Sequence, residues 1–177
     1  LNFKINLMKK FALILTIIMS LAVSKNTIAQ GTIVDVAVGN KDFSTLVTAL
    51  KAADLVGALQ GEGPFTVFAP TNDAFAKIDS NTLGSLLEVK NQKALANILT
   101  YHVISGKITA TDVVSALEKG NGTVELKALN GQVLTVVQKD GKIWLKDVNG
   151  NYSEIVATDV MSNNGVIHVI NTVVMPN

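Results

Sequence analysis

Residues 65–75 read FTVFAPTNDAF and combine three structural signals in a short space. The first half alternates as a β-strand does, with neighbouring side chains on opposite faces. Pro70 then removes a backbone donor and favours extended geometry at the residue before it. Thr71 or Asn72 can cap a helix that starts at Asp73. The stretch therefore predicts a strand that stops at a proline and leads directly into a capped helix.

Helical periodicity dominates the chain on both sides of this stretch. In residues 31–59 apolar side chains recur at intervals of three and four, and Asp42 or Ser44 is expected to begin a second helix. The run GEGP at 61–64 ends this helical part, because glycine and proline interrupt helices. Further short, leucine-rich helices are predicted for residues 76–100.

The C-terminal half changes to the alternating period of β-strands. Three pairs of residues that suit tight hairpin turns are nearly evenly spaced: Asn130-Gly131, Asp140-Gly141 and Asn149-Gly150. The runs TVELKAL, QVLTVVQK and KIWLKDV lie between or beside them, and they predict a meander of antiparallel strands. The last run, GVIHVINTVVM at 165–175, is apolar at both parities. It predicts a strand that is covered on both faces.

Length and composition fit one globular domain. The chain has 177 residues, of which 48% are hydrophobic and 16% charged. It has no cysteine, which excludes disulfides, thiolate metal sites and cysteine nucleophiles. Residues 31–177 are therefore predicted to form a single α+β domain that is stabilised by packing.

Residues 1–30 have the three parts of a secretory signal peptide. Met8 and two lysines precede an apolar run at 11–23, and small residues follow with cleavage sites after Ser24 or Ala29. A membrane anchor is the alternative, but a span needs about 20 apolar residues. Residues 1–7 precede the expected initiator Met8 and are interpreted as an N-terminal extension. The protein is therefore expected to be secreted or periplasmic, with no stable membrane insertion after cleavage.

Loss of the signal peptide changes the charge of the chain. Four of the fifteen lysines precede residue 31 and no acidic residue does, so residues 31–177 carry 11 lysines, 14 acidic residues and a net charge of −3. All basic residues are lysines, so the chain has no guanidinium group for bidentate contacts to phosphates or base edges. Nucleic acid is therefore not expected as a partner.

The sequence has no recognisable catalytic motif or cofactor-binding motif. The nucleophile elbow GxSxG, the zinc motif HExxH, the phosphate-binding P-loop and GxGxxG are all absent. His102 and His168 are the natural acid or base candidates, but no nucleophile lies beside either in sequence, so structural roles are favoured. Asp73 and Asp79 are expected near helix ends rather than as a catalytic pair.

Residues 147–151, DVNGN, resemble the start of a calcium loop. The sixth position is Tyr152 instead of glycine and the twelfth is Thr158 instead of glutamate, so the segment is interpreted as a hairpin turn. No metal, cofactor or catalytic residue is predicted, and the protein is not expected to be an enzyme.

Three segments, in this order, resemble the signature blocks of the fasciclin (FAS1) domain. They are FTVFAPTNDAF, the Tyr101-His102 pair after a leucine-rich helix, and NGVIHVINTVVMP at 164–176. The resemblance extends from TIVDVA at 32–37 to the C-terminus, as expected of a single-domain bacterial-type member. It implies a wedge of antiparallel β-strands, arranged as a sandwich or meander, that packs with several helices from the N-terminal half.

The resemblance also implies residues for partner contact. The Tyr-His segment and its flanking aliphatics are associated with adhesion in animal members, and a second motif precedes the last signature strand. The matching positions here are Leu99, Tyr101, His102, Val103, Ile104, Asp159, Val160 and Met161. The alternative is that these residues pack and contact no partner. Two positions depart from the family pattern, since Asn72 and Asn171 stand where aspartate is frequent, but both keep a side-chain acceptor for capping.

Two functions from different classes follow from these observations. The first is a non-enzymatic adhesion module that contacts a protein or polysaccharide partner at a cell surface, in a matrix or in a biofilm, and is expected to be a monomer. The second is a periplasmic or extracellular carrier or sensor of a small apolar ligand held between the sheet and the helices. A cleft of roughly 300 Å³ or more with convergent polar groups favours the carrier, whereas a filled core favours adhesion.

Overall fold

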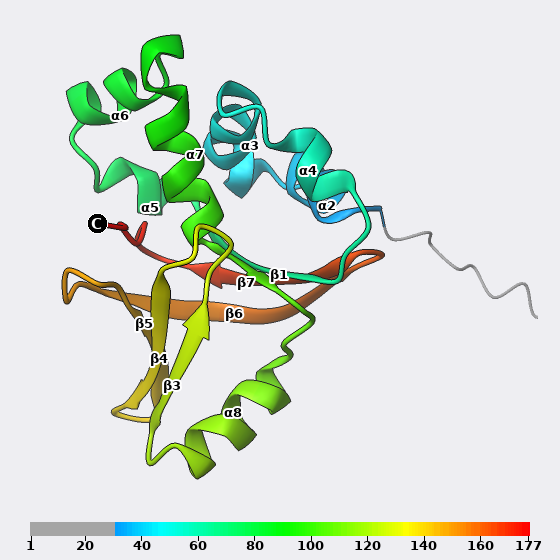
Figure 1. The fold of residues 1–177 in the computed structure, drawn as a ribbon, viewed down its shortest axis with the longest axis vertical. Helices are drawn as coiled ribbons and strands as arrows, with labels where there is room; N and C mark the ends of the chain where they lie inside the picture. The colour runs from blue at the N-terminus through cyan, green and yellow to red at the C-terminus, as the bar shows by residue number, and fades with distance from the viewer. Residues whose placement is uncertain (1–30) are drawn as a thin grey trace, which may run out of the picture.

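The computed structural model describes residues 31–177. The signal peptide, the Met8 start and the extension expected for residues 1–30 lie outside the described residues. Short helices fill most of the N-terminal half: α2 (Ile33–Gly39), the 3-10 helix η2 (Lys41–Phe43), α3 (Ser44–Ala52), α4 (Val56–Gln60), α5 (Asn72–Ala76), α6 (Ser80–Leu86), the 3-10 helix η3 (Val89–Asn91) and α7 (Gln92–Tyr101). A further helix, α8 (Ala110–Lys119), lies apart from them beside the C-terminal strands (Figure 1).

Seven strands form one sheet in the order β2-β1-β7-β6-β5-β4-β3. They are β1 (Phe65–Pro70), β2 (Val103–Ser105), β3 (Thr123–Lys127), β4 (Val133–Lys139), β5 (Lys142–Lys146), β6 (Tyr152–Ser162) and β7 (Gly165–Ile170). All neighbouring strands are antiparallel except β1 and β7, which run parallel over their whole length. The predicted α+β wedge is confirmed, but its strands are not all antiparallel as predicted, because β1 and β7, second and third from the β2 edge, run parallel.

The central strands β1 and β7 separate two hydrophobic clusters. Val67, Ala69 and Ile167 face the cluster under helices α2–α7. Phe68 and Ile170 have the opposite parity and face a second cluster with α8 and the meander. In Figure 1 the helices α2–α7 accordingly lie on one side of these strands and β3–β5 with α8 on the other. Both faces of β7 are buried, as its sequence predicted.

The opening stretch folds as a strand followed by a capped helix. Thr71 is the N-cap of α5 and its Oγ1 accepts a hydrogen bond from the amide of Ala74 at 3.3 Å. The helix begins at Asn72, one residue earlier than predicted. Asn72 serves another helix: its Oδ1 accepts from the amide of Thr45 at 3.0 Å, in the first turn of α3, and its Nδ2 donates to the carbonyl of Lys41. A carboxylate could not make the second bond, because it has no donor.

Three elements were not predicted from the sequence, namely β2, β6 and α8, and one strand is shorter than predicted. The helix α8 follows a capping box in which Thr109 and Asp112 bond each other's backbone amides. The strand β6 has register shifts between Ile155 and Val160 that break its alternation. The strand β7 ends at Ile170, whereas its apolar run continues to Met175, and residues 171–177 form a C-terminal segment without regular structure or ladder partners.

The three predicted hairpin turns are present. Gly131, Gly141 and Gly150 have positive φ values of 88°, 74° and 86°. Asp140 also has a positive φ, which fits the two-residue turn between β4 and β5. The loops of the other two turns are longer by one residue, which lies directly before the asparagine. Backbone pairing resumes directly after the glycine, at Gln132 in one turn and at Asn151 in the other.

Replacement of Gly131 by valine is expected to lower the free energy of unfolding by about 1–3 kcal/mol, since a β-branched residue is strained at positive φ. No atom lies within 4 Å of a Cβ at this position, so the loss reports backbone strain and not a collision. Urea unfolding followed by circular dichroism measures it. A variant as stable as the parent would show that the turn does not require a left-handed residue.

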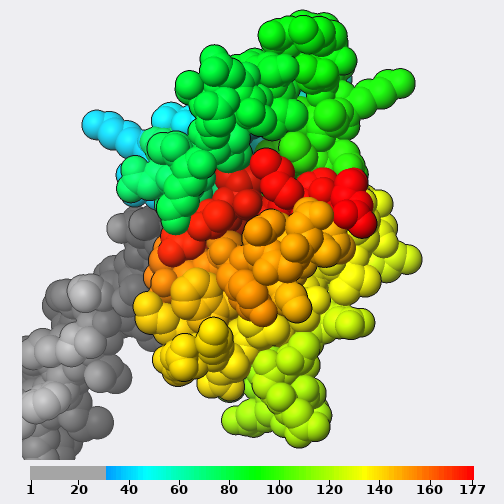
Figure 2. Space-filling model, turned by 90° about the vertical axis from the view of Figure 1, so that its left-hand side faces the viewer, coloured from blue at the N-terminus to red at the C-terminus, as the bar shows by residue number. Residues whose placement is uncertain are grey.

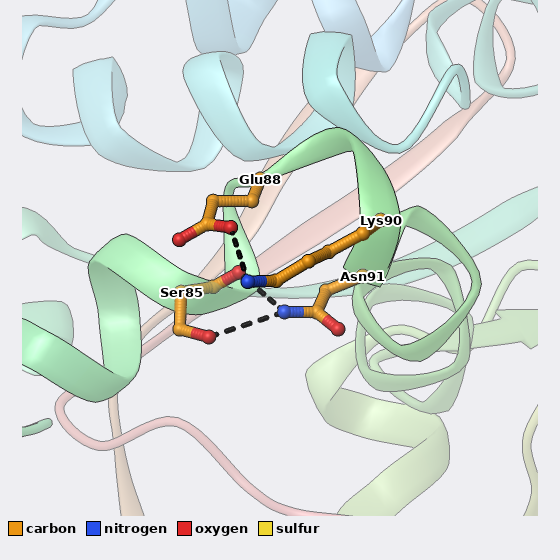
Figure 3. Close-up of polar contacts among 4 residues, drawn as sticks. All are labelled: Ser85, Glu88, Lys90 and Asn91. Carbon is orange, nitrogen blue, oxygen red and sulfur yellow. Dashed lines mark hydrogen bonds and ion pairs between the residues drawn. The ribbon is translucent and has the colours of Figure 1, made fainter.

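The connection between α6 and α7 is held by local polar contacts (Figure 3). The Nδ2 of Asn91 donates to the carbonyl of Ser85 at 2.7 Å and to its Oγ at 3.1 Å. Glu88 and Lys90 form an ion pair of 2.7 Å with both side chains more than half exposed. Exposed pairs stabilise little, so the amide of Asn91 is the contact that fixes this turn.

Candidate interaction site

Tyr101 is the last residue of α7, and its ring is fully buried between the helices and the meander. The hydroxyl donates to the carbonyl of Val133 at 2.9 Å and accepts from the amide of Val148 at 3.2 Å. Val133 and Val148 belong to two different hairpins. Burial raises the pKa of the Tyr101 hydroxyl, so it stays protonated as the donor. Tyr101 therefore joins the helical half to two meander loops.

Replacement of Tyr101 by phenylalanine keeps the ring and removes only the hydroxyl. It leaves the carbonyl of Val133 and the amide of Val148 without this partner, so a loss of about 1–3 kcal/mol in unfolding free energy is expected. Thermal melting compares the two proteins. The matched control is Tyr152→Phe, because Tyr152 is 47% exposed and its loss of a hydroxyl should change stability by less than about 0.5 kcal/mol.

His102 is the C-cap residue of α7, and both of its ring nitrogens contact the backbone. Nδ1 lies 2.8 Å from the carbonyl oxygen of Ile98, which requires the proton on Nδ1. Nε2 then accepts from the amide of Val174 at 3.2 Å, in the C-terminal segment. The side chain is 2% exposed, and burial lowers the pKa of His102 to about 4. The neutral imidazole thus fastens the C-terminal segment to the helix end.

The flanking aliphatic residues are also core residues. Leu99, Val103 and Ile104 are 3%, 3% and 4% exposed, and they divide between the two hydrophobic clusters. With Tyr101 and His102 they make five predicted contact residues that present no side-chain surface to a partner in this structure. The alternative, that these positions pack, is therefore the one the burial supports.

The second predicted contact segment, Asp159 to Met161, is half-buried in the irregular part of β6. Asp159 has a φ of +59°, and its Oδ1 accepts from the amide of Ala110 at 2.9 Å, at the start of α8. A carboxylate at a helix N-terminus is favourable, since free amides and the helix dipole attract it. Asp159 therefore positions α8, while Val160 and Met161 keep partial exposure.

His168 lies in the centre of β7. Its Nε2 lies 2.8 Å from the carbonyl oxygen of Ile108, and its Nδ1 accepts from the amide of Asp159 at 3.4 Å. The ring also packs on Phe68, with 5.6 Å between centroids. Both histidines thus have their ring nitrogens on backbone atoms, and neither has a nitrogen free to move a proton for a substrate.

Comparisons with known proteins agree with this architecture. The family model of the fasciclin domain matches residues 41–176. The chain belongs to the fasciclin domain family. A relative from Synechocystis, protein sll1483, is 52% identical over 145 residues, which are 82% of this chain and 73% of the relative. The cell surface glycolipoprotein MPB83 of Mycobacterium bovis is 34% identical over 84% of this chain and 62% of its own length.

A solved structure confirms the fold independently. A domain pair from the insect cell adhesion molecule fasciclin I superposes with a TM-score of 0.70 at 20% identity, covering 80% of this chain and 50% of that chain. The wedge predicted from the three signature blocks is thus the fasciclin fold.

The interior of this fasciclin domain leaves no room for a ligand. The space between the helices and the sheet has a volume of about 20 Å³ and is lined by apolar side chains and His102. That volume holds about one water molecule. Two larger spaces, of about 560 and 670 Å³, are open grooves on the surface. Both surface grooves exceed the roughly 300 Å³ expected of a carrier, but the space between the helices and the sheet, where its apolar ligand was expected, does not.

The turn at 147–151 is a structural turn, as predicted, but Asp147 has a role that was missed. The side chain is 4% exposed. Oδ1 accepts from the amides of Asn149 and Asn151, and Oδ2 accepts from the amide of Met175 at 3.2 Å. Asp147 and His102 therefore hold neighbouring residues of the C-terminal segment. The sequence of the turn gives no signal for the contact between Oδ2 and the amide of Met175, because Met175 lies 28 positions later in the chain.

Asn164 is a second residue whose role was missed, although it opens the third signature block. Its Oδ1 accepts from the amide of Ile33 at 2.9 Å, and its Nδ2 donates to the carbonyls of Leu59 and Gly61. One amide thus fixes the start of α2 and the end of α4 on the β6–β7 hairpin. Only Asn or Gln can donate and accept in this way.

Within the described residues, no group of three or more His, Cys, Asp or Glu side chains is arranged to hold a metal ion. Asp73 and Asp79 lie in the first turn of α5 and at the N-cap of α6, as expected of helix-end carboxylates. In residues 31–177 no helix has the length and apolar character needed to cross a membrane.

Proposed function

We propose that this protein is an exported, non-catalytic adhesion module that contacts a partner at a cell surface, in a matrix or in a biofilm. The observation that carries the proposal is the use of both imidazoles within the fold: each ring nitrogen of His102 and His168 contacts a backbone atom. A fold that uses both of its imidazoles for internal hydrogen bonds leaves neither free for acid–base chemistry, which suits recognition rather than catalysis.

Two further observations support the proposal. The relatives include one named as a cell surface protein, and one of the matching solved structures is from a cell adhesion molecule. The sequence at 1–30 has the pattern of a secretory signal peptide, which would deliver the domain to the outside. A carrier of a small apolar ligand is disfavoured, because the space between helices and sheet is about 20 Å³.

Retention on cells tests the proposal. Residues 31–177, which include the described members of both hydrophobic clusters, are added in labelled form to washed cells of the encoding organism and to their extracellular matrix. Saturable retention that unlabelled protein competes away is expected. A matched amount of unfolded protein serves as the control for nonspecific adsorption. Absence of saturable retention on both cells and matrix would contradict the proposal.

A further inference from the structure

The outer face of the meander carries two rows of side chains that run across the strands. The register places Glu125 opposite Thr135, Thr135 opposite Lys146, and Lys146 opposite Tyr152, so one row crosses β3, β4, β5 and β6. Since strands lie about 4.8 Å apart, this row is about 14 Å long. A second row with Trp144 and Glu154 lies beside it.

This face is partly open to solvent, since Glu125 and Tyr152 are exposed while Thr135 and Lys146 are half-buried. The side chains of opposite parity, Leu134, Val136 and Leu145, are fully buried and pack with Val113 and Leu117 of α8. The helix α8 therefore covers only the inner face of the meander. Figure 2 shows strands of the meander and β6, in yellow and orange, at the surface between the helices and α8.

The four residues of the first row line an open groove with a volume of about 670 Å³. Val148, Asn149 and Gly150 of the turn after β5 also line it. The lining is mainly polar: hydroxyls of threonine and tyrosine, one amide, one exposed carboxylate and one ammonium group. Donors and acceptors of hydrogen bonds therefore alternate along an open channel that an extended polymer could enter and leave.

The charges of the groove favour an uncharged occupant. Glu125 and Lys146 contribute one charge of each sign, and the carboxylate of Asp147 is engaged by backbone amides below the surface. A polyanion or polycation would meet a like charge within the row, whereas hydroxyl groups can bond to both ends. The groove also has no deep apolar pocket of the kind that anchors a protein partner.

Tyr152 supplies the apolar contact that a sugar ring requires. Its side chain is 47% exposed at the end of the row, and the ammonium of Lys146 lies 5.9 Å from the centre of its ring. The face of an aromatic ring is electronegative and attracts the polarised C–H groups of a pyranose, while the hydroxyl of the tyrosine can bond to a neighbouring sugar.

We propose that this groove binds a neutral, hydroxyl-rich polysaccharide, with its chain across β3–β6 and one sugar ring against Tyr152. The inference rests on the proposed adhesion function and names the partner class and the surface. A single site of this size and polarity binds weakly. A polymer with many repeats compensates, because a released domain rebinds to the same chain.

Native gel electrophoresis measures the interaction, since residues 31–177 carry a net charge of −3 and migrate at neutral pH. The gels contain galactomannan, hydroxyethylcellulose, the anionic polymer alginate or no polymer. Retardation is expected in at least one neutral polymer and not in alginate. The apparent affinity should fall at least fivefold in Tyr152→Ala and at least twofold in Glu125→Ala, and it should be retained within twofold in Tyr152→Phe. Val89→Ala, at an 88% exposed position on the helical half, is the matched control.

Thermal melting of each variant confirms that it is folded, and Glu125→Ala replaces Tyr152→Ala if the latter unfolds. No retardation in either neutral polymer, retardation by alginate alone, or retardation that these substitutions leave unchanged overturns the inference. Cell retention that depends on Tyr152 without polysaccharide retardation would assign the surface to a protein partner instead. Retention on cells without any polysaccharide binding would contradict this inference alone. Polysaccharide binding without retention on cells would contradict only the proposed function.

Discussion

Replacement of Gly165 by alanine is expected to lower the free energy of unfolding by about 3 kcal/mol or more. Gly165 opens β7 directly opposite Phe65, the first residue of the parallel partner β1. A Cβ at Gly165 would lie inside van der Waals contact with the carbonyl oxygen of Phe65 and 2.7 Å from Cδ1 of Ile33. The first contact is with backbone, which cannot rotate away, so the two central strands must separate.

Urea unfolding of Gly165→Ala and of Gly84→Ala makes the test specific. Gly84 lies inside α6, and a Cβ there meets nothing within 4 Å. Alanine is a better helix former than glycine by about 1 kcal/mol, so Gly84→Ala should be neutral or stabilising. A loss of stability in Gly165→Ala that is absent from Gly84→Ala reports crowding at the β1–β7 junction. A Gly165→Ala protein as stable as the parent would mean that the strands are not packed as closely as described.

The sequence predicted the elements that depend on local signals. The strand and capped helix of residues 65–75 follow from Pro70 and Thr71, and the hairpins follow from their glycines at positive φ. The parallel pairing of β1 with β7 has no local signal, because about 100 residues separate the two strands and a run that is apolar on both faces does not specify its neighbour.

The candidate site was predicted less well, because the sequence does not show whether the side chains of its segments pack inside the fold or face solvent. Tyr101 and His102 are polar enough to be contact residues, yet their polar atoms are used by Val133, Val148 and Val174, residues distant in sequence. The outer row of the meander was missed for a related reason. Its members, such as Glu125 and Tyr152, come from four strands and converge only through the register of the sheet.

Replacement of His102 by alanine is expected to lower stability most at neutral pH and less in acid. At pH 7 the variant loses the bonds to Ile98 and Val174 and leaves a cavity, so its unfolding free energy should fall by about 3 kcal/mol. The folded parent keeps His102 neutral down to a pKa of about 4, whereas the unfolded chain takes up the proton near pH 6.5.

The sign follows from proton binding. Between pH 6.5 and about 4 the unfolded state binds more protons than the folded state, so the parent loses stability as the pH falls, by about 3 kcal/mol across this range. The alanine variant lacks this proton, so the difference between the two proteins should narrow by that amount. Urea unfolding at pH 7.5, 6, 5 and 4 measures the difference directly.

Tyr101→Phe is the matched control, because it weakens the same helix end without removing a group that titrates in this range. Its stability should stay below that of the parent by a constant amount from pH 7.5 to 4. A His102→Ala difference that is likewise constant would show that the imidazole does not titrate with the folding equilibrium. If the variant instead melts like the parent but is no longer retained on cells, His102 contacts a partner. The hydrogen bond between its imidazole and the amide of Val174 would then not be what stabilises the fold.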